Sequence, residues 1–140
     1  MKRFVPATLL ALPFLALAGG PAAAADVQEV LRQEIADACD GAPGKVAREG
    51  AIARDLDGDG LEDLIVSHEY ITCSGGMMGR SLFCGMQVCS VNVYLRGPRG
   101  LALREELLGA GVRVGSGPVP TVTMYQHGGG EWSFTMDPAR

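Results

Sequence analysis

Four cysteines, Cys39, Cys73, Cys84 and Cys89, constrain the fold of this 140-residue chain more than any other feature. An even number of cysteines in a small exported domain predicts two disulfides, for which three connectivities are possible. Cys84 and Cys89 enclose a short segment and can close a small loop at low entropic cost. The favoured pairing joins these two and joins Cys39 to Cys73, a bridge worth about 3–4 kcal/mol between an N-terminal helix and a strand.

The N-terminus predicts export. Lys2 and Arg3 precede an apolar stretch, and Ala23-Ala24-Ala25 provides the small-x-small pattern that signal peptidase recognises. The apolar stretch is shorter than the ~20 residues of a spanning helix, which argues against a retained membrane anchor. We expect a signal peptide over residues 1–25, cleavage after Ala25, and a periplasmic or secreted product.

The mature part, residues 26–140, is expected to form a single acidic domain. The signal peptide takes two of the twelve basic residues and none of the sixteen acidic residues, which leaves a formal charge of −6. Nucleic acid and anionic membranes both favour clusters of Lys and Arg, and the sequence has no such cluster. The composition therefore argues against both partners, and no membrane span is expected after cleavage.

The spacing of apolar residues predicts an α+β fold, with one N-terminal helix packed on a mainly antiparallel, disulfide-bonded sheet. Helical spacing begins at Asp26, a predicted N-cap, and ends at Gly41. Beyond Gly50 the period changes to two, which is typical of strands. Strands are expected at 51–53, 64–73, 88–95, 121–126 and 131–136, the last two as a hairpin, whereas 101–108 fits either a strand or a short helix.

The most informative motif is Asp55-Leu56-Asp57-Gly58-Asp59-Gly60-Leu61-Glu62-Asp63. Calcium prefers six to eight oxygen ligands, and carboxylates at alternate positions of a tight loop can converge on one point. We expect side-chain oxygens from Asp55, Asp57 and Asp59. Leu61 would contribute its carbonyl, and Asp63 a direct or water-bridged contact. The alternative is an Asp/Gly-rich hairpin turn that binds no ion.

This motif differs from an EF-hand loop, because Val66 stands at the twelfth position, where an EF-hand has a bidentate Glu. The pattern DxDGDGxxDLxV is matched instead, by Asp55, Asp57, Asp59, Asp63, Leu64 and Val66. Residues 50–68 thus resemble a single FG-GAP/VCBS calcium repeat, and the layout with its Cys-Gly-x-x-x-Cys segment resembles small exported bacterial proteins. The resemblance implies a calcium ion between two strands. A propeller needs several blades, so the adhesion roles of multi-repeat proteins are not implied.

Other residues offer chemistry of different kinds. His68 and His127 could serve catalysis, but His68 and Glu69 would point to opposite faces of the expected strand, and no linear catalytic motif is present. Met77, Met78 and Met86 lie among the cysteines and would suit Cu(I). Oxidised cysteines and methionines in loops or gaps of the core are the simpler interpretation.

The leading hypothesis is therefore an exported calcium-stabilised binding or accessory module without catalytic activity. Its partner would be an unidentified protein or glycan. The alternative hypothesis is a small secreted enzyme or a copper-handling protein.

Overall fold

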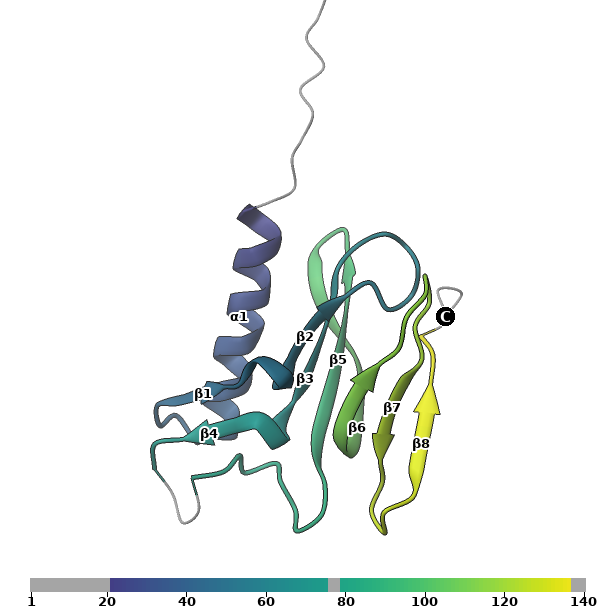
Figure 1. Cartoon of the computed structure of the whole chain (residues 1–140). Coiled ribbons are helices and arrows are strands. Elements are labelled where there is room, and N and C mark those ends of the chain that lie inside the picture. Colours follow the sequence, from purple (N-terminus) through teal and green to yellow (C-terminus); the bar gives the residue numbers. More distant parts are fainter. Residues whose placement is uncertain (1–20, 76–78, 137–140) are drawn as a thin grey trace, which may run out of the picture.

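The structure, a computed structural model, describes residues 21–75 and 79–136. These residues form one α-helix, α1 (Pro21–Ala38), and two antiparallel sheets (Figure 1). The prediction of one N-terminal helix, mainly antiparallel strands and two disulfides is confirmed for this part of the chain. Most of the expected signal peptide lies outside the described residues. Among those described, no helix combines the length and the apolar character needed to cross a bilayer.

The larger sheet of the described residues has six strands in the order β2-β3-β5-β6-β7-β8. These strands are β2 (Ala51–Arg54), β3 (Asp63–Ser67), β5 (Cys89–Gly97), β6 (Gly100–Val114), β7 (Val122–Tyr125) and β8 (Glu131–Phe134). A smaller sheet, formed by β1 (Gly44–Val46) and β4 (Ile71–Cys73), lies near the C-terminal end of α1 (Figure 1).

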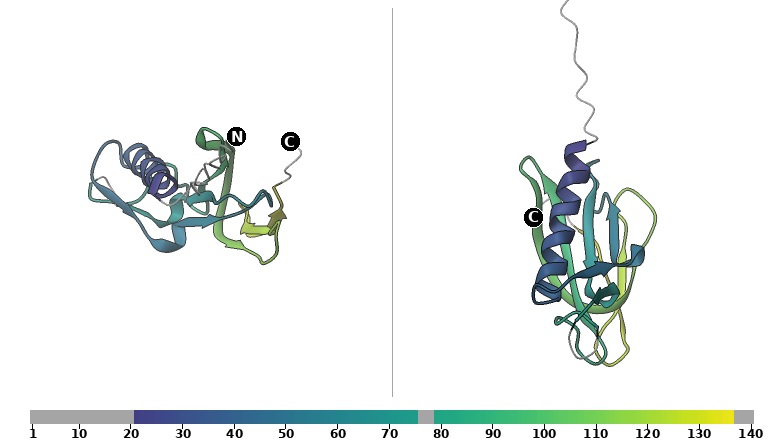
Figure 2. Two further views of the ribbon diagram at one scale, coloured as in Figure 1. Left: turned by 90° about the horizontal axis from the view of Figure 1, so that it is seen from above. Right: turned by 90° about the vertical axis from the view of Figure 1, so that its left-hand side faces the viewer.

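The larger sheet separates two hydrophobic cores, because β3 and β5 present successive side chains to opposite faces. On one face Ile65 and Val93 belong to a core that also contains Leu56, Val91, Val112, Val122, Met124 and Met136. On the other face Leu64 and Val66 pack in a core with the apolar side of α1, namely Val27, Val30, Leu31 and Ile35. Figure 2 shows α1 running along one face of the sheet.

Strand β6 is long and irregular. Its register shifts once opposite Val93–Tyr94 of β5 and once after Ala110, where Gly111 has a φ of 60°. Such irregularities bend and twist a sheet, and the two ends of β6 thereby pair with β5 and with β7 around the same core. Gly109 permits the close packing there, since a Cβ at this position would lie 2.2 Å from the Sδ atom of Met124.

The start of α1 differs from the prediction. The helix begins at Pro21, five residues before Asp26, because alanines favour helix and proline is tolerated in a first turn. Asp26 is therefore not an N-cap. Its carboxylate accepts hydrogen bonds from Arg96 Nη1 (2.9 Å) and from the Leu101 N–H (2.7 Å), which connects α1 to the β5–β6 hairpin.

The prediction of a single strand over residues 64–73 is wrong. The chain leaves the larger sheet after Ser67, makes a 3-10 turn at His68–Tyr70 and continues as β4, which pairs with β1. Every residue from Asp63 to His68 is buried. The exposure of side chains therefore does not alternate along this segment, and no such pattern marks the end of β3 at Ser67. The ambiguous segment 101–108 is part of β6, and the pairing of β7 with β8 confirms the terminal hairpin.

Both predicted disulfides are confirmed. Cys39–Cys73 spans 34 residues and connects the end of α1 to β4. Cys84–Cys89 spans five residues and closes a small loop before β5. No cysteine is left as a free thiol, as expected of a protein that folds in an oxidising compartment.

We predict that Gly109→Ala lowers the free energy of unfolding by about 1–3 kcal/mol, because the new methyl group would overpack the core at Met124. Urea unfolding of the purified protein measures the change. Gly130→Ala is the matched control, since no heavy atom lies within 4 Å of a Cβ there. Equal stability of the two variants would contradict the packing described for β6 and β7.

Candidate functional site

The aspartate loop, residues 55–63, connects β2 to β3, which pair antiparallel from Ala51 opposite Val66 to Arg54 opposite Asp63. Leu56 is fully buried in the core shared by β3, β5 and β7, and it anchors the loop. Gly58 and Gly60 have φ values of 81° and 84°, which glycine adopts without strain. The two glycines thus allow the loop between β2 and β3 to turn tightly, and the buried Leu56 side chain attaches the loop to the core.

Backbone N–H groups fix the orientation of the aspartates near the loop's tip. Asp55 accepts hydrogen bonds from the N–H groups of Gly58 (2.7 Å) and Gly60 (2.8 Å). Asp57 accepts one from the Asp59 N–H (3.1 Å). A carboxylate has about four acceptor sites, so both side chains keep acceptor capacity for a further ligand.

Asp63, the first residue of β3, has no solvent exposure. Its Oδ2 atom accepts a hydrogen bond from the Leu56 N–H (2.8 Å), and its Oδ1 atom accepts one from the Arg96 N–H (2.8 Å). The carboxylate of Asp63 therefore connects the aspartate loop to the end of β5.

Three predicted ligands come together. One oxygen each of Asp55, Asp57 and Asp63 lies within 4.8 Å of the others, close enough to hold one metal ion. Asp59 is exposed and outside this group, and its carboxylate accepts a hydrogen bond from the Leu61 N–H (2.7 Å). The roles expected of Asp59 and of the Leu61 carbonyl stay predictions.

The electrostatics of the loop disfavour negative charge. Burial raises the pKa of Asp63, and the charges of Asp57 and Asp59 raise it further, against hydrogen bonds that lower it. Burial also raises the pKa of Asp57, to which the charges of Asp59 and Asp55 add. A raised carboxyl pKa means that folding disfavours the ionised form. A cation bound among these oxygens would reverse that effect.

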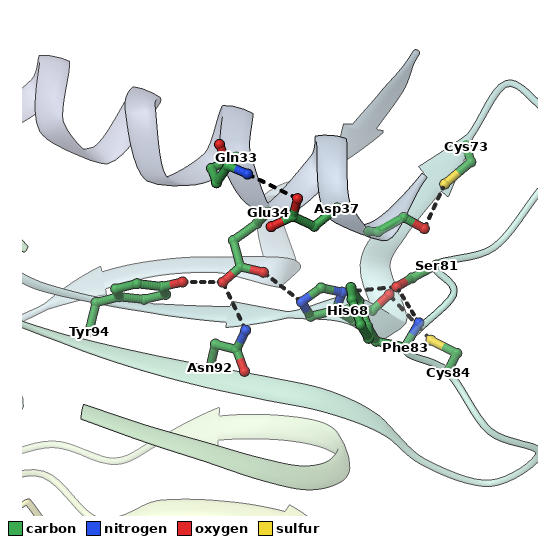
Figure 3. Close-up of polar contacts among 11 residues, drawn as sticks. Gln33, Glu34, Asp37, His68, Cys73, Ser81, Phe83, Cys84, Asn92 and Tyr94 are labelled. Carbon is green, nitrogen blue, oxygen red and sulfur yellow. Dashed lines mark hydrogen bonds and ion pairs between the residues drawn. The ribbon is translucent and has the colours of Figure 1, made fainter. Parts of the chain in front are cut away.

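A second polar cluster lies between α1 and the sheet and consists of Glu34, His68 and Ser81 (Figure 3). His68 Nε2 lies 2.8 Å from Glu34 Oε2, and His68 Nδ1 lies 2.9 Å from Ser81 Oγ. All three side chains are buried, the most exposed being Glu34 at 6%. They come from α1, from the 3-10 turn and from the segment before Cys84, so only the fold brings them together.

The hydrogen bonds of this cluster limit where its protons lie. An ionised Glu34 can only accept, so His68 donates from Nε2. When the imidazole is neutral, its Nδ1 atom accepts the hydroxyl proton of Ser81, whose Oγ atom also accepts a hydrogen bond from the Phe83 N–H (3.1 Å). The Phe83 ring packs edge-on against the imidazole, with 5.2 Å between ring centroids.

Glu34 is held in its ionised form by several donors. Its Oε1 atom accepts hydrogen bonds from Asn92 Nδ2 (2.8 Å) and from the Tyr94 hydroxyl. Burial alone would raise the pKa of Glu34, but the hydrogen bonds from His68, Tyr94 and Asn92 together lower it. Burial and the hydrogen bond to Glu34 raise the pKa of Tyr94, which stays a neutral donor.

Sequence reasoning missed this cluster because it paired His68 with its neighbour Glu69. In the structure Glu69 is exposed and accepts a hydrogen bond from the Gly111 N–H (2.8 Å) at the irregularity of β6. A signal was available: Glu34 is the one acidic residue at helical spacing within the apolar series Val27, Val30, Leu31, Ile35 and Ala38. A charged residue on a buried helix face needs partners from elsewhere in the fold.

Apart from His68, the residues considered for catalysis or for copper do not form a cluster within the part of the chain that the structure describes. His127 is exposed in the turn between β7 and β8. Met86 is fully exposed, and both disulfides remove the thiolates that a soft metal would use. Met77 and Met78 lie outside the described residues.

No family model matches the chain, and no curated protein or solved structure matches it either.

We predict that Glu34→Gln lowers the free energy of unfolding by about 2–3 kcal/mol at pH 7, because a glutamine cannot accept all the hydrogen bonds that the carboxylate accepts. The pKa of Glu34 is lowered in the folded protein, so its stabilising effect is complete above the unfolded pKa of about 4.3. It is lost as the pH falls through the folded pKa. The difference between wild type and variant should therefore shrink below about pH 4.

Denaturant unfolding at a series of pH values measures this difference. Glu29→Gln is the matched control, since Glu29 lies on the same helix but is exposed and forms an ion pair with Arg32, which is also exposed. Its substitution should leave stability unchanged. A loss from Glu34→Gln that is constant from pH 7 to pH 3 would contradict the assignment of an ionised Glu34.

Proposed function

We propose that the chain is an exported domain that binds one Ca²⁺ in the aspartate loop and uses the ion to stabilise its fold, as a binding or accessory module. The observation that carries the proposal is the group of three oxygens from Asp55, Asp57 and Asp63. One of the three belongs to a carboxylate with no solvent exposure.

The spacing of these oxygens is compatible with calcium. Two ligands of one Ca²⁺, each at about 2.3–2.6 Å, lie at most ~5.2 Å apart, and the three oxygens lie within 4.8 Å of one another. The choice of calcium over other divalent ions comes from the loop motif, whose oxygen ligands alternate around glycines as in calcium loops. Asp59, the Leu61 carbonyl and water would complete the six to eight ligands that calcium prefers.

The resemblance of residues 50–68 to an FG-GAP/VCBS repeat supports the same role. In the structure the aspartate loop connects two antiparallel strands, β2 and β3, as that type of repeat requires. We infer that calcium stabilises this hairpin and, through Asp63 and the Arg96 N–H, its contact with β5. Calcium sites of extracellular modules commonly have dissociation constants of about 10⁻⁴–10⁻³ M, which suits a structural ion.

Export is supported by the predicted signal peptide and by the two disulfides. The proposed partner is a protein or a glycan. Large apolar side chains are exposed beside and within the loop closed by Cys84–Cys89, namely Leu82, Phe83 and Met86. Apolar side chains gathered on a surface favour contact with a partner.

We predict that 5 mM Ca²⁺ raises the melting temperature by about 4–8 °C over a chelator, since a ligand of the folded state with a dissociation constant of about 0.1–1 mM contributes about 1–2 kcal/mol. Asp57→Asn should abolish most of this shift. In chelator the same variant should melt at or above the wild-type temperature, because it removes a carboxylate charge that burial and its neighbours disfavour.

Calorimetric melts of wild type and Asp57→Asn, each with calcium and with chelator, test whether the wild type is the more stable protein only when calcium is present. Glu62→Gln is the matched control: it removes a charge from the same loop at an exposed position outside the proposed ligands, and it should keep the full calcium shift. Identical melts of the wild type with calcium and with chelator would reject the proposed site.

We further predict that the exported protein begins at Asp26. The intact mass of protein recovered from a host with an oxidising periplasm should correspond to residues 26–140 and should increase by four hydrogens after reduction. A retained N-terminus or four free thiols before reduction would contradict export through a cleaved signal peptide.

A further inference from the structure

We propose that Ser81, His68 and Glu34 form a catalytic centre for acyl transfer, in which Ser81 is the nucleophile and a short-chain acyl ester is the substrate. The three side chains form a continuous hydrogen-bonded series, with 2.9 Å from Ser81 Oγ to His68 Nδ1 and 2.8 Å from His68 Nε2 to Glu34 (Figure 3). A hydroxyl, an imidazole and a carboxylate in this order occur in serine hydrolases, irrespective of chain order. Here the two ring nitrogens are exchanged relative to that arrangement, because His68 Nδ1 faces Ser81 and Nε2 faces Glu34. Either ring nitrogen can accept a proton while the other one donates.

With a neutral imidazole, the proton positions match those that such a centre needs. Ser81 then donates to His68, and the imidazole nitrogen that faces the hydroxyl can accept its proton. The other nitrogen carries a proton toward the ionised Glu34, which holds the ring in this tautomer. The Phe83 ring covers the imidazole, and Asn92 and Tyr94 fix the carboxylate. These contacts hold the imidazole and the carboxylate in place, whereas Ser81 is carried by the segment before Cys84.

A cleft of about 450 Å³ gives this centre a place for substrate. Ser81 lines it together with Ala38, Ala42, Leu82 and Arg80, and cysteines of both disulfides contribute to its wall. The volume is in the range of small-ligand sites, and small apolar side chains suit a short acyl chain. Arg80 and Asp40 are the charged residues of the lining. Arg80 Nη2 donates to the Gly85 carbonyl (3.2 Å) and lies 4.0 Å from Cys89 Sγ, and the guanidinium carries further N–H donors.

The proposed reaction conserves atoms and charge. Ser81 Oγ attacks the ester carbonyl carbon as its proton passes to His68 Nδ1, and Arg80 stabilises the negative charge that develops on the carbonyl oxygen. The carbon–alkoxy bond then breaks, and the alkoxide leaves as an alcohol with the proton from His68. Water, deprotonated by His68, attacks the acyl-serine in the same way and releases the carboxylic acid.

Glu34 acts through His68 and is a positioning residue. Its carboxylate stabilises the imidazolium that forms during each proton transfer, which requires that Glu34 remain ionised. This inference departs from the non-enzymatic hypothesis, whose argument assumed a strand that would separate His68 from its acidic partner. The acidic partner is instead supplied by α1.

The test uses a fluorophosphonate probe on the calcium-loaded, oxidised protein. Attack by Ser81 Oγ would displace fluoride and form a stable phosphonyl-serine, visible as an increase in intact mass. Fragmentation of the labelled peptide should place the adduct on Ser81 in the wild type, a result that does not depend on the folding of any variant. Ser81→Ala should not be labelled, whereas Ser133→Ala, at an exposed position on β8, should label as fast as wild type.

The role of Glu34 has its own measurement, because its loss also lowers stability. Glu34→Gln should slow labelling of the folded protein by about tenfold or more. It should also move the midpoint of the pH–rate profile to lower pH, since the carboxylate that favours an imidazolium is removed. A merely structural Glu34 would leave that midpoint unchanged. Hydrolysis of p-nitrophenyl acetate should follow the same order of variants.

Two results would overturn the proposal. The first is a wild-type protein that melts normally and acquires no phosphonyl group at saturating probe. The second is an adduct that maps to a residue other than Ser81. In either case Glu34, His68 and Ser81 would serve only to connect α1 to the sheet.

Discussion

The position of the aspartate loop against β3 and β5 depends on the buried carboxylate of Asp63. This carboxylate accepts hydrogen bonds from the aspartate loop at Leu56 and from the end of β5 at Arg96, so a single side chain joins three segments of the chain. The same burial, together with the charges of neighbouring aspartates, makes its ionised form unfavourable. A cation among Asp55, Asp57 and Asp63 would resolve this conflict, because it adds attraction without displacing the backbone donors. In the calcium proposal, the positive charge of the ion compensates the buried negative charge of Asp63.

Glu34 presents the same problem on the opposite face of the sheet and has a different solution. It is also a buried carboxylate, but three side-chain donors surround it, and its pKa is lowered where that of Asp63 is raised. Hydrogen-bond donors of the protein itself thus stabilise the charge of Glu34, whereas Asp63 lies beside further carboxylates. This difference separates the two proposals: a bound ion is proposed for the aspartate loop, whose acids lie beside one another, whereas the buried carboxylate of Glu34 already has His68, Asn92 and Tyr94 as hydrogen-bond donors.

Local patterns in the sequence predicted much of this arrangement. The Cys84–Cys89 bridge, the terminal hairpin and the end of α1 follow from short-range spacing, and Cys39–Cys73 follows as the remaining pair of cysteines. Asp55, Asp57 and Asp63 were expected to lie together because they belong to one short loop with glycines at its turns. The features that were missed depend on contacts between distant segments. The break after Ser67 is invisible in a run of buried residues, and His68 meets its acidic partner 34 positions away. The position of Glu34 on the apolar face of α1 was the only local indication of that contact.

Equilibrium dialysis of the oxidised wild-type protein against radioactive calcium tests the central claim most directly, because it counts bound ions without reference to stability or activity. The account predicts saturation at one calcium per chain, with half-saturation at about 0.1–1 mM. A protein that retains no calcium above background at 10 mM would contradict it.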